Sequence, residues 1–571
     1  MQKHIITCIF LSLCLWAYTQ EADIPSSLKQ GLIPSTYNRN ALTVVVLENN
    51  CSYITDIKQA TQNIIIPEKF DDNTVSAKYI RSASGKDAIL NAINQSNLGN
   101  QILSTWFSRA SDGSFNMALI AERGLYNATV NDMVRASASK LGMDKIRDAG
   151  QALVDNSYIQ VIEYSDVISM EEYYDRQDEA NYKSARQSGK EFKKVSRTKN
   201  GWRAKAVSYL FKIDTAYVEP LFNEMWIYED DDNATKIQKK ALFDNTNFPF
   251  EYVMMVSHDA DGSQDNPSKL TGLPQQLSRE QLFAQLINSS IHTAQYSFER
   301  SYEPFRVKTP LYAVKPIRAK IGTKEGLSVE HRFYVMENVM NAKGKIKAKR
   351  QGVIHAKKVA NNSFIASEND IPMSKFYQTA GKSLEPGMTL QQRNDYGIGL
   401  STGVATGGMM GFYIKAEGNI ASLANMAAGS KNLFPITQLK LFGSLAFDTD
   451  SSYDGYETSF IRMQVGLSKG FYFWRNFSLV PFVAYGSEQA TPAYLLEGYS
   501  INGDFLNLGS YFTINLFHNL QFVTTLNYYA LLGKAYEQYD GETTEKYDYK
   551  YDYYFEGRSG PNLELGLRFE F

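Results

Sequence analysis

Cysteine is nearly absent from this chain. Of its three cysteines, Cys8 and Cys14 lie in the first twenty residues, and only Cys51 follows them. Because a single cysteine has no partner within the chain, an intramolecular disulfide is excluded beyond that point. Long apolar runs are also missing: after the start of the chain no stretch reaches about 18 apolar residues, which excludes a membrane-spanning helix. Stability must therefore come from packing or from closure of a sheet.

Neither sign of charge dominates, with 59 basic and 61 acidic residues. This balance argues against a dedicated nucleic-acid-binding protein, so nucleic acid is not an expected partner. Two local stretches, 183–205 and 343–358, are basic. One interpretation is that they contact anionic headgroups or acidic envelope polymers. The other is that the first is a solvated linker and the second the outer face of a hairpin. The second interpretation is favoured for both.

Recognisable catalytic and metal-binding motifs are missing too. No HExxH pattern, no GxSxG nucleophile elbow and no P-loop is present, and the histidines stand in no ligand spacing. The stretches FDTDSSYDGYE and HDADGSQD lack the glycine and glutamate spacing of a calcium loop, so turn chemistry is the favoured interpretation. We therefore predict a non-enzymatic protein with no catalytic residues, no cofactor and no metal ligands.

The first residues, 1–19, have the pattern of a secretory signal peptide. Lys3 and His4 precede an apolar run from Ile5 to Ala17, and cleavage is expected after Thr19. About 13 apolar residues are too few to cross a hydrocarbon core of ~30 Å as a helix. Residues 20–40 are expected to be a linker.

Residues 41–263 mix helical and extended patterns. LTVVVL (42–47), the strand within 143–167, AVSYLFKI (206–213) and YVMMVS (252–257) are expected strands, the last of them an interior one. Helical spacing occurs in 86–107 and, less clearly, in 125–141. Alternating helices and strands predict one or more mixed α/β domains.

Two further segments follow. In 264–304, Ser278 and Gln281 form a capping box at the start of an amphipathic helix whose apolar stripe includes Leu282, Phe283 and Leu286. In 305–367, short alternating strands are separated by glycines, which predicts a small all-β module. Its segment IGTKEGLSVEHRFYV (321–335) resembles the small β-modules of periplasmic envelope-assembly proteins. Residues 368–392 are expected to be a linker.

From residue 393 to residue 571 the pattern becomes entirely extended. Eight segments have strand length: Asp395–Val404, Met410–Gly418, Thr437–Phe447, Phe460–Ser468, Phe477–Tyr485, Leu506–Asn515, Leu520–Ala530 and Asn562–Phe571. In the last one, leucines and phenylalanines alternate with Glu564, Gly566, Arg568 and Glu570. Segments of about 9 to 11 residues suit tilted strands that cross a bilayer, although a soluble β-sandwich also alternates.

Three features favour a membrane barrel over a sandwich. The connections differ in length, and GFYFWRNF places a group of aromatic residues at one rim. The last strand carries Phe569 and Phe571. This pattern resembles Gram-negative eight-stranded outer-membrane β-barrels, in which a terminal aromatic residue helps the barrel-assembly machinery to recognise the chain. One connection departs from the expected alternation, because NIASLANMAAGSKNLFP (about 419–436) should be short; it is either a periplasmic cap or an error in the strand count.

The expected fold is therefore multidomain: an N-terminal mixed α/β periplasmic region with a small all-β module, followed by a C-terminal eight-stranded antiparallel transmembrane β-barrel. An even strand number returns both barrel ends to one side, which in such barrels is the periplasm. The expected location is the outer membrane, with outer-membrane lipid and the barrel-assembly machinery as partners.

Two groups of residues are candidate sites. The predicted lumen charges are interpreted either as paired structural charges, which we favour, or as an ion path: Glu417, Lys440, Arg462, Glu564, Arg568 and Glu570. The last outer loop is a candidate recognition surface, because tyrosine-rich surfaces bind protein and glycan well, but it is equally consistent with a solvated loop: Tyr536, Tyr539, Tyr547, Asp548, Tyr549, Tyr551, Asp552, Tyr553 and Tyr554.

Three functions follow from these patterns. The first is a non-enzymatic barrel that anchors a periplasmic scaffold or assembly domain, with an unknown periplasmic protein partner. The second is a surface receptor or adhesin that binds protein or glycan through its outer loops. The third, and least favoured, is a barrel-borne hydrolase whose site is assembled from distant residues.

Overall fold

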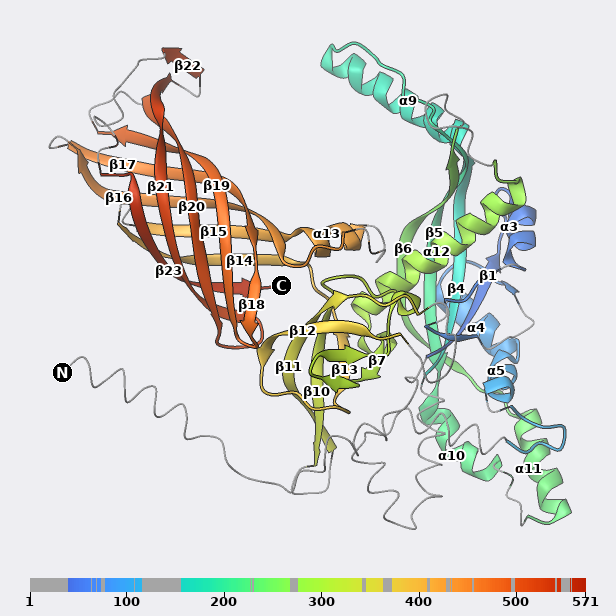
Figure 1. Ribbon diagram of the computed structural model, residues 1–571. Coiled ribbons are helices and arrows are strands. Elements are labelled where there is room, and N and C mark those ends of the chain that lie inside the picture. The colour runs from blue at the N-terminus through green and yellow to red at the C-terminus, as the bar shows by residue number, and fades with distance from the viewer. Residues whose placement is uncertain are drawn as a thin grey trace.

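The computed structural model describes residues 40–62, 64–67, 69–72, 78–106, 108–115, 156–225, 227, 231–266, 276–340, 346–362, 372–407, 411–427, 432, 434–453, 456–493, 499–539, 542–545, 555 and 557–571. The predicted signal peptide, most of the following linker and the helix expected at 125–141 lie outside these residues. Figure 1 shows a barrel, a smaller β-module and an α/β region arranged along the chain.

The α/β region is built on a six-stranded sheet with the order β2-β1-β4-β5-β6, and β3 also pairs with β1. The parallel part joins β1 to β2, β3 and β4, whereas β4, β5 and β6 are antiparallel. The strands are β1 (Ala41–Glu48), β2 (Asp71–Asp72), β3 (Tyr79–Arg81), β4 (Ser157–Ser169), β5 (Lys199–Ile213) and β6 (Phe250–Asp265). The predicted mixed α/β character is confirmed.

Helices cover both faces of this sheet because β1 is apolar on both sides. Leu42, Val44 and Val46 share a core with Phe283 of α12, whereas Val45 belongs to the core on the opposite face. The helices of the first face are α3 (Ile54–Thr61) and α12 (Arg279–Ser301), and those of the second include α4 (Lys86–Gln95), α5 (Leu98–Trp106), α10 (Thr215–Met225) and α11 (Asn233–Asn245). A further helix, α9 (Met170–Ser188), extends from the end of β4 (Figure 1).

Local sequence signals explain most of these boundaries. Both hydrogen bonds of the predicted capping box join Ser278 and Gln281 at the start of α12. The helix expected over 86–107 is instead divided into α4 and α5, because Asn97 adopts a left-handed φ of 56°. YVMMVS is part of β6, which within the described residues pairs with β5 alone and is an edge strand rather than an interior one. HDADGSQD also belongs to β6 rather than to a turn.

The β-module is a seven-stranded sheet with the order β7-β13-β10-β11-β12-β9-β8. A short turn of 3-10 helix, η1 (Glu303–Phe305), precedes the module and buries Phe305 in the core of the α/β region. The elements of the module are β7 (Lys308–Pro310), β8 (Ala313–Val314), β9 (Ile317–Ala319), η2 (Thr323–Glu325), β10 (Arg332–Met340), β11 (Ile346–Lys358), β12 (Ser374–Gly381) and β13 (Thr389–Arg393). Phe333, Val335, Ile354 and Leu390 are buried in its core. The stretch 368–392, expected as a linker, therefore contains β12 and most of β13, and polar residues of these strands such as Ser374 and Thr379 are buried.

The third part is a closed eight-stranded antiparallel barrel, as predicted. Its strands are β14 (Ile398–Gly407), β15 (Gly411–Asn419), β16 (Leu439–Tyr453), β17 (Tyr456–Lys469), β19 (Phe477–Pro492), β20 (Tyr499–Asn515), β21 (Leu520–Tyr539) and β23 (Gly560–Glu570). Pairing of β14 with β23 closes the barrel. Several strands run past their predicted ends into polar sequence, where the apolar alternation used to find them stops.

Three short elements lie at the two ends of the barrel. At the end nearer the module are α13 (Ile420–Ala427), between β15 and β16, and β18 (Phe471–Trp474), between β17 and β19. At the opposite end β22 (Glu542–Glu545) pairs with β21. The C-terminal end lies near the module (Figure 1), where Phe571 accepts a hydrogen bond from the backbone N–H of Tyr396. Both ends of the barrel chain therefore lie at the same side.

Candidate functional site

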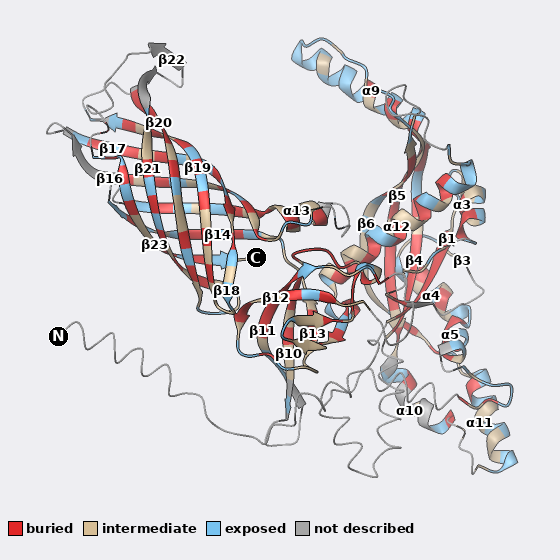
Figure 2. Cartoon of the chain, viewed as in Figure 1, coloured by how far each residue is buried: buried red, intermediate tan, exposed pale blue. Residues whose placement is uncertain are grey.

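The barrel has an apolar outside, and its inside holds buried charged side chains together with aromatic residues such as Phe442 and Phe482. Figure 2 shows buried and exposed residues alternating along its strands. Exposed apolar residues include Leu400, Val404, Ile414, Leu441, Val465, Leu467, Leu508, Leu526, Leu567, Phe569 and Phe571. A monomeric water-soluble protein rarely exposes an apolar surface that encircles it, so this belt needs an apolar environment.

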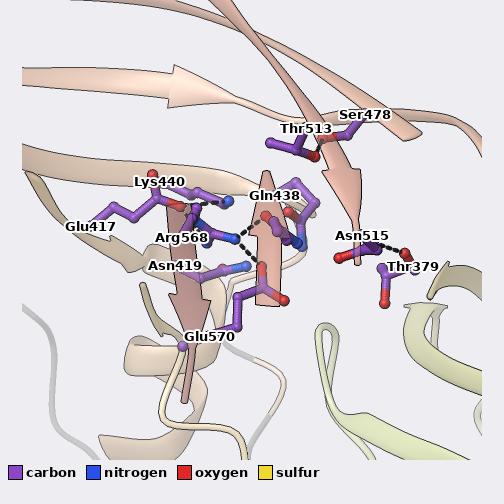
Figure 3. Close-up of polar contacts among 12 residues, drawn as sticks. Thr379, Glu417, Asn419, Gln438, Lys440, Ser478, Thr513, Asn515, Arg568 and Glu570 are labelled. Atoms are coloured by element: carbon purple, nitrogen blue, oxygen red, sulfur yellow. Dashed lines mark hydrogen bonds and ion pairs between the residues drawn. The ribbon is translucent and has the colours of Figure 1, made fainter. Parts of the chain in front are cut away.

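One cluster of charges fills the barrel interior near the module. Lys440 Nζ lies 2.8 Å from Glu417 Oε1, and Arg568 forms an ion pair with the same carboxylate. Tyr511 donates a hydrogen bond of 2.9 Å to the other oxygen of Glu417. Arg568 also pairs with Glu570, as Figure 3 shows. Lys415 Nζ also lies 3.9 Å from Glu417 Oε2, so three basic side chains surround the two carboxylates of this cluster.

A second cluster lies towards the opposite end. Arg462 Nη2 lies 2.9 Å from Glu488 Oε2, and Arg558 Nη2 lies 2.5 Å from Glu488 Oε1. Arg558 Nη1 in turn lies 3.1 Å from Asp448 Oδ2. The four side chains come from β16, β17, β19 and the segment before β23, so they connect strands across the lumen. Asp448, considered above as part of a turn, is buried in β16.

Glu564 lies apart from both clusters. It accepts hydrogen bonds of 3.3 Å from the side chains of Asn527 and Tyr529. The six predicted lumen residues thus point into the barrel but divide into separate groups. Five of the six take part in the ion pairs described here, whereas Glu564 is held by neutral donors.

The module and the barrel meet at a buried carboxylate, Glu330. Tyr377 of β12 donates hydrogen bonds of 2.8 and 2.9 Å to its two oxygens. From the barrel side, Asn419 Nδ2 and Gln438 Nε2 donate to Glu330 Oε2 at 2.9 and 2.6 Å. The Glu330 carboxylate therefore accepts hydrogen bonds from one side chain of the module and from two side chains on the barrel side.

Further hydrogen bonds surround this contact. Asn476, before β19, donates to the carbonyl oxygen of Gly381 and accepts from its N–H group. Asn515 donates to the carbonyl oxygen of Thr379, and Asn425 of α13 donates to that of Val329 (Figure 3). The unusually long connection between β15 and β16 thus packs against the module, and the strand count holds.

Burial controls the ionisation of the module residues at this junction. It raises the pKa of Glu330, against the opposing effect of the nearby His355. It also raises the pKa of Tyr377 well above its usual value, with the Glu330 carboxylate adding to the shift. The pKa of His331 falls to about 4 because of burial, and its Nδ1 accepts a hydrogen bond of 3.3 Å from the Ser328 N–H.

The tyrosine-rich loop lies largely outside the described residues. Tyr536 and Tyr539 belong to β21, and β22 follows shortly after them. The side chains of the loop are not described from Tyr536 to Tyr554, so its recognition role stays a prediction.

Neither a metal cluster nor a membrane-spanning helix occurs among the described residues. No group of three His, Cys, Asp or Glu side chains there has the arrangement of a metal site. No described helix is both long enough and apolar enough to cross a membrane.

The sequence missed the junction and three of the four residues of the second lumen cluster. Glu330 lies in a polar turn, and its partners are between 47 and 108 residues away, so no local pattern marks it. Glu488 and Asp448 lie just beyond the predicted ends of their strands. Continuing the alternation past Tyr485 would have placed Glu488 on the lumen face.

Among known proteins, no family model matches the chain, and no curated protein matches it. Similar solved structures include a major outer membrane protein from Thermus thermophilus (13% identity, TM-score 0.20, 30% of this chain and 98% of that one) and Neisserial surface protein A (12%, 0.21, 31% and 100%). A third is the attachment invasion locus protein of Yersinia pestis (12%, 0.18, 30% and 95%). The assignment of a closed barrel is based on the strand pairing of this chain itself.

Proposed function

We propose that this chain is a non-enzymatic outer-membrane protein whose barrel anchors a scaffold or assembly region in the periplasm. The observation that carries the proposal is the continuous apolar belt around a closed barrel whose interior is filled with paired charges. Such a surface is stable in lipid, because the closed sheet satisfies every backbone group and leaves no open edge.

The junction supports the anchoring role. Glu330, Asn476 and Asn515 join the module to the barrel mouth with hydrogen bonds that are partly or fully buried. A mouth covered by a fixed module suits an anchor better than a channel. Both ends of the barrel chain lie at this mouth, which supports the proposal that the α/β region and the module lie on the periplasmic side.

Topology is tested by labelling intact cells with a membrane-impermeant maleimide. In a Cys51→Ser background, Thr544→Cys places a thiol in β22, and Ser184→Cys places one on the exposed face of α9. We expect Thr544→Cys to label on intact cells and Ser184→Cys only after permeabilisation. Labelling of both without permeabilisation would contradict the periplasmic assignment, and labelling of neither would contradict the barrel's exposure at the surface.

The scaffold role is tested by deleting residues 536–556 from the full chain. We expect the deletion to leave periplasmic crosslinks from the α/β region unchanged. If those crosslinks persist but binding of cells to protein or glycan surfaces is lost, the chain is a receptor or adhesin instead. Hydrolysis of lipid or peptide substrates by the purified full chain would favour the third candidate, a barrel-borne hydrolase.

A further inference from the structure

Three arginines of the module converge on one aromatic ring. The Cζ atoms of Arg350, Arg393 and Arg332 lie 3.7, 4.9 and 5.9 Å from the centre of the Tyr334 ring. They come from the adjacent strands β11, β13 and β10, and Arg332 stands directly opposite Arg393 in the sheet register. Like charges in that position destabilise a sheet unless something compensates them.

No acidic side chain compensates this cluster within ion-pair distance in the described part of the chain. The nearby carboxylates are engaged elsewhere: Glu303 accepts from the Gln391 amide and Glu337 from the Gln351 amide. Glu570, which interacts electrostatically with Arg332, is paired with Arg568. Arg332 is 4% exposed, and its Nε is buried without an acceptor. A buried guanidinium nitrogen without an acceptor is costly, which points to an anion as the missing partner.

The barrel contributes the neighbouring wall. His518, in the turn between β20 and β21, lies with its ring centre 6.4 Å from that of Tyr334. Its backbone oxygen accepts a hydrogen bond of 3.3 Å from Arg332 Nη2. Burial lowers the pKa of His518, and Arg350 and Arg332 lower it further, so this ring stays neutral at physiological pH. The positive charge of the cluster therefore comes from the three arginines.

The position of the cluster indicates where its ligand comes from. The same turn exposes Leu516 and Phe517, the latter to 67%. Phe473 and Trp474 are also exposed at this end of the barrel, and Trp474 stacks on Phe477. A ring of exposed aromatic residues is typical of the boundary between hydrocarbon and headgroups. The arginines next to this rim thus lie at the depth of lipid phosphates.

We propose that Arg332, Arg350 and Arg393 bind the phosphate of an anionic phospholipid headgroup in the periplasmic leaflet. Guanidinium groups bind phosphate oxygens with paired hydrogen bonds, and all three lie within cation–π distance of the Tyr334 ring. The inference rests on the proposed insertion of the barrel. Free phosphate shares this chemistry, but only a lipid would also use the apolar rim.

The test uses the full chain in detergent micelles, titrated with phosphatidylglycerol, phosphatidylcholine or inorganic phosphate and followed by native mass spectrometry. The Arg332→Gln, Arg350→Gln and Arg393→Gln changes are combined in one variant. The matched control removes three exposed charges elsewhere: Arg186→Gln, Lys190→Gln and Lys193→Gln. A single variant, Arg350→Gln, removes an exposed arginine and serves if the triple variant fails to fold.

We expect preferential binding of phosphatidylglycerol, about hundredfold weaker binding in the triple variant and roughly fivefold weaker binding in Arg350→Gln. The control variant should bind as the wild type does. An unchanged affinity in the arginine variants, or an equal loss in the control, overturns the site. Arginine-dependent binding of inorganic phosphate without preference for the lipid overturns the headgroup as its source. Failure of the chain to insert in bilayers contradicts the proposed function, and the phosphate titration still reports on the arginines.

Discussion

Glu330 and Gln438 are joined by a hydrogen bond of 2.6 Å, and both residues adopt a left-handed backbone, with φ of 70° and 51°. For residues other than glycine and asparagine such a conformation costs on the order of 1–2 kcal/mol each. One residue belongs to the module and the other precedes the first residue of β16. The interactions across the junction therefore offset backbone strain on both of its sides.

Removing the Glu330 side chain should loosen the module from the barrel. Glu330→Ala leaves Tyr377, Asn419 and Gln438 with buried donors and no acceptor, which costs about 3 kcal/mol. Hydrogen exchange of the full chain in micelles should show faster exchange in β12 and α13 and no change in the barrel strands. Lys349→Ala, on an exposed position of β11, is the control. Equal protection in both variants would contradict the role given to Glu330.

Acid should weaken the module through His331. Its pKa is about 4 in the folded chain and 6.5 when unperturbed, so the neutral ring stabilises the fold above pH 6.5. As pH falls from 6.5 to 4, the fold loses this stability, by at most about 3 kcal/mol. The actual loss is smaller than this limit because the ring is partly exposed to solvent. His331→Gln should flatten the thermal-stability profile in this window. Because Glu330 titrates in both chains, the difference between them reports His331 alone.

Glu488 should be essential for a stable barrel. Glu488→Ala leaves Arg462 and Arg558 facing each other without their shared carboxylate, which costs about 3–5 kcal/mol for such a buried group. Urea titrations that follow the shift between folded and unfolded gel bands should show an earlier transition. Glu457→Gln, exposed on β17, should leave the transition in place. An unshifted transition for Glu488→Ala would mean that the pairs contribute little.

The barrel should not conduct ions. Paired side chains occupy its interior at two levels, and the module covers one mouth. Planar bilayers containing the full chain should therefore show no steps of current at neutral pH. Glu417→Ala combined with Arg568→Ala removes only the charges nearer the module, so the second cluster and the module should still keep this variant closed. Conductance of the unmodified chain would instead favour the ion-path interpretation of the lumen charges.

The sequence predicted elements better than it predicted their contacts. The eight barrel strands were found because an apolar face against lipid forces a strict alternation, as in Leu565, Leu567 and Phe569. The same alternation placed Lys440 and Arg462 on the lumen face. It failed where strands leave the membrane, since Asp448 and Glu488 continue the strands in polar sequence. Glu330 could not be found, because only the folded chain brings its partners to it.

Only four residues, 394–397, separate the last strand of the module from the first strand of the barrel. Fully extended, such a connection spans roughly 14 Å. This short connection limits how far the module can separate from the barrel. Even if every hydrogen bond of the junction were broken, the module would stay within about that distance of the barrel mouth. Loss of the junction would therefore change the orientation of the module far more than its position at the barrel mouth.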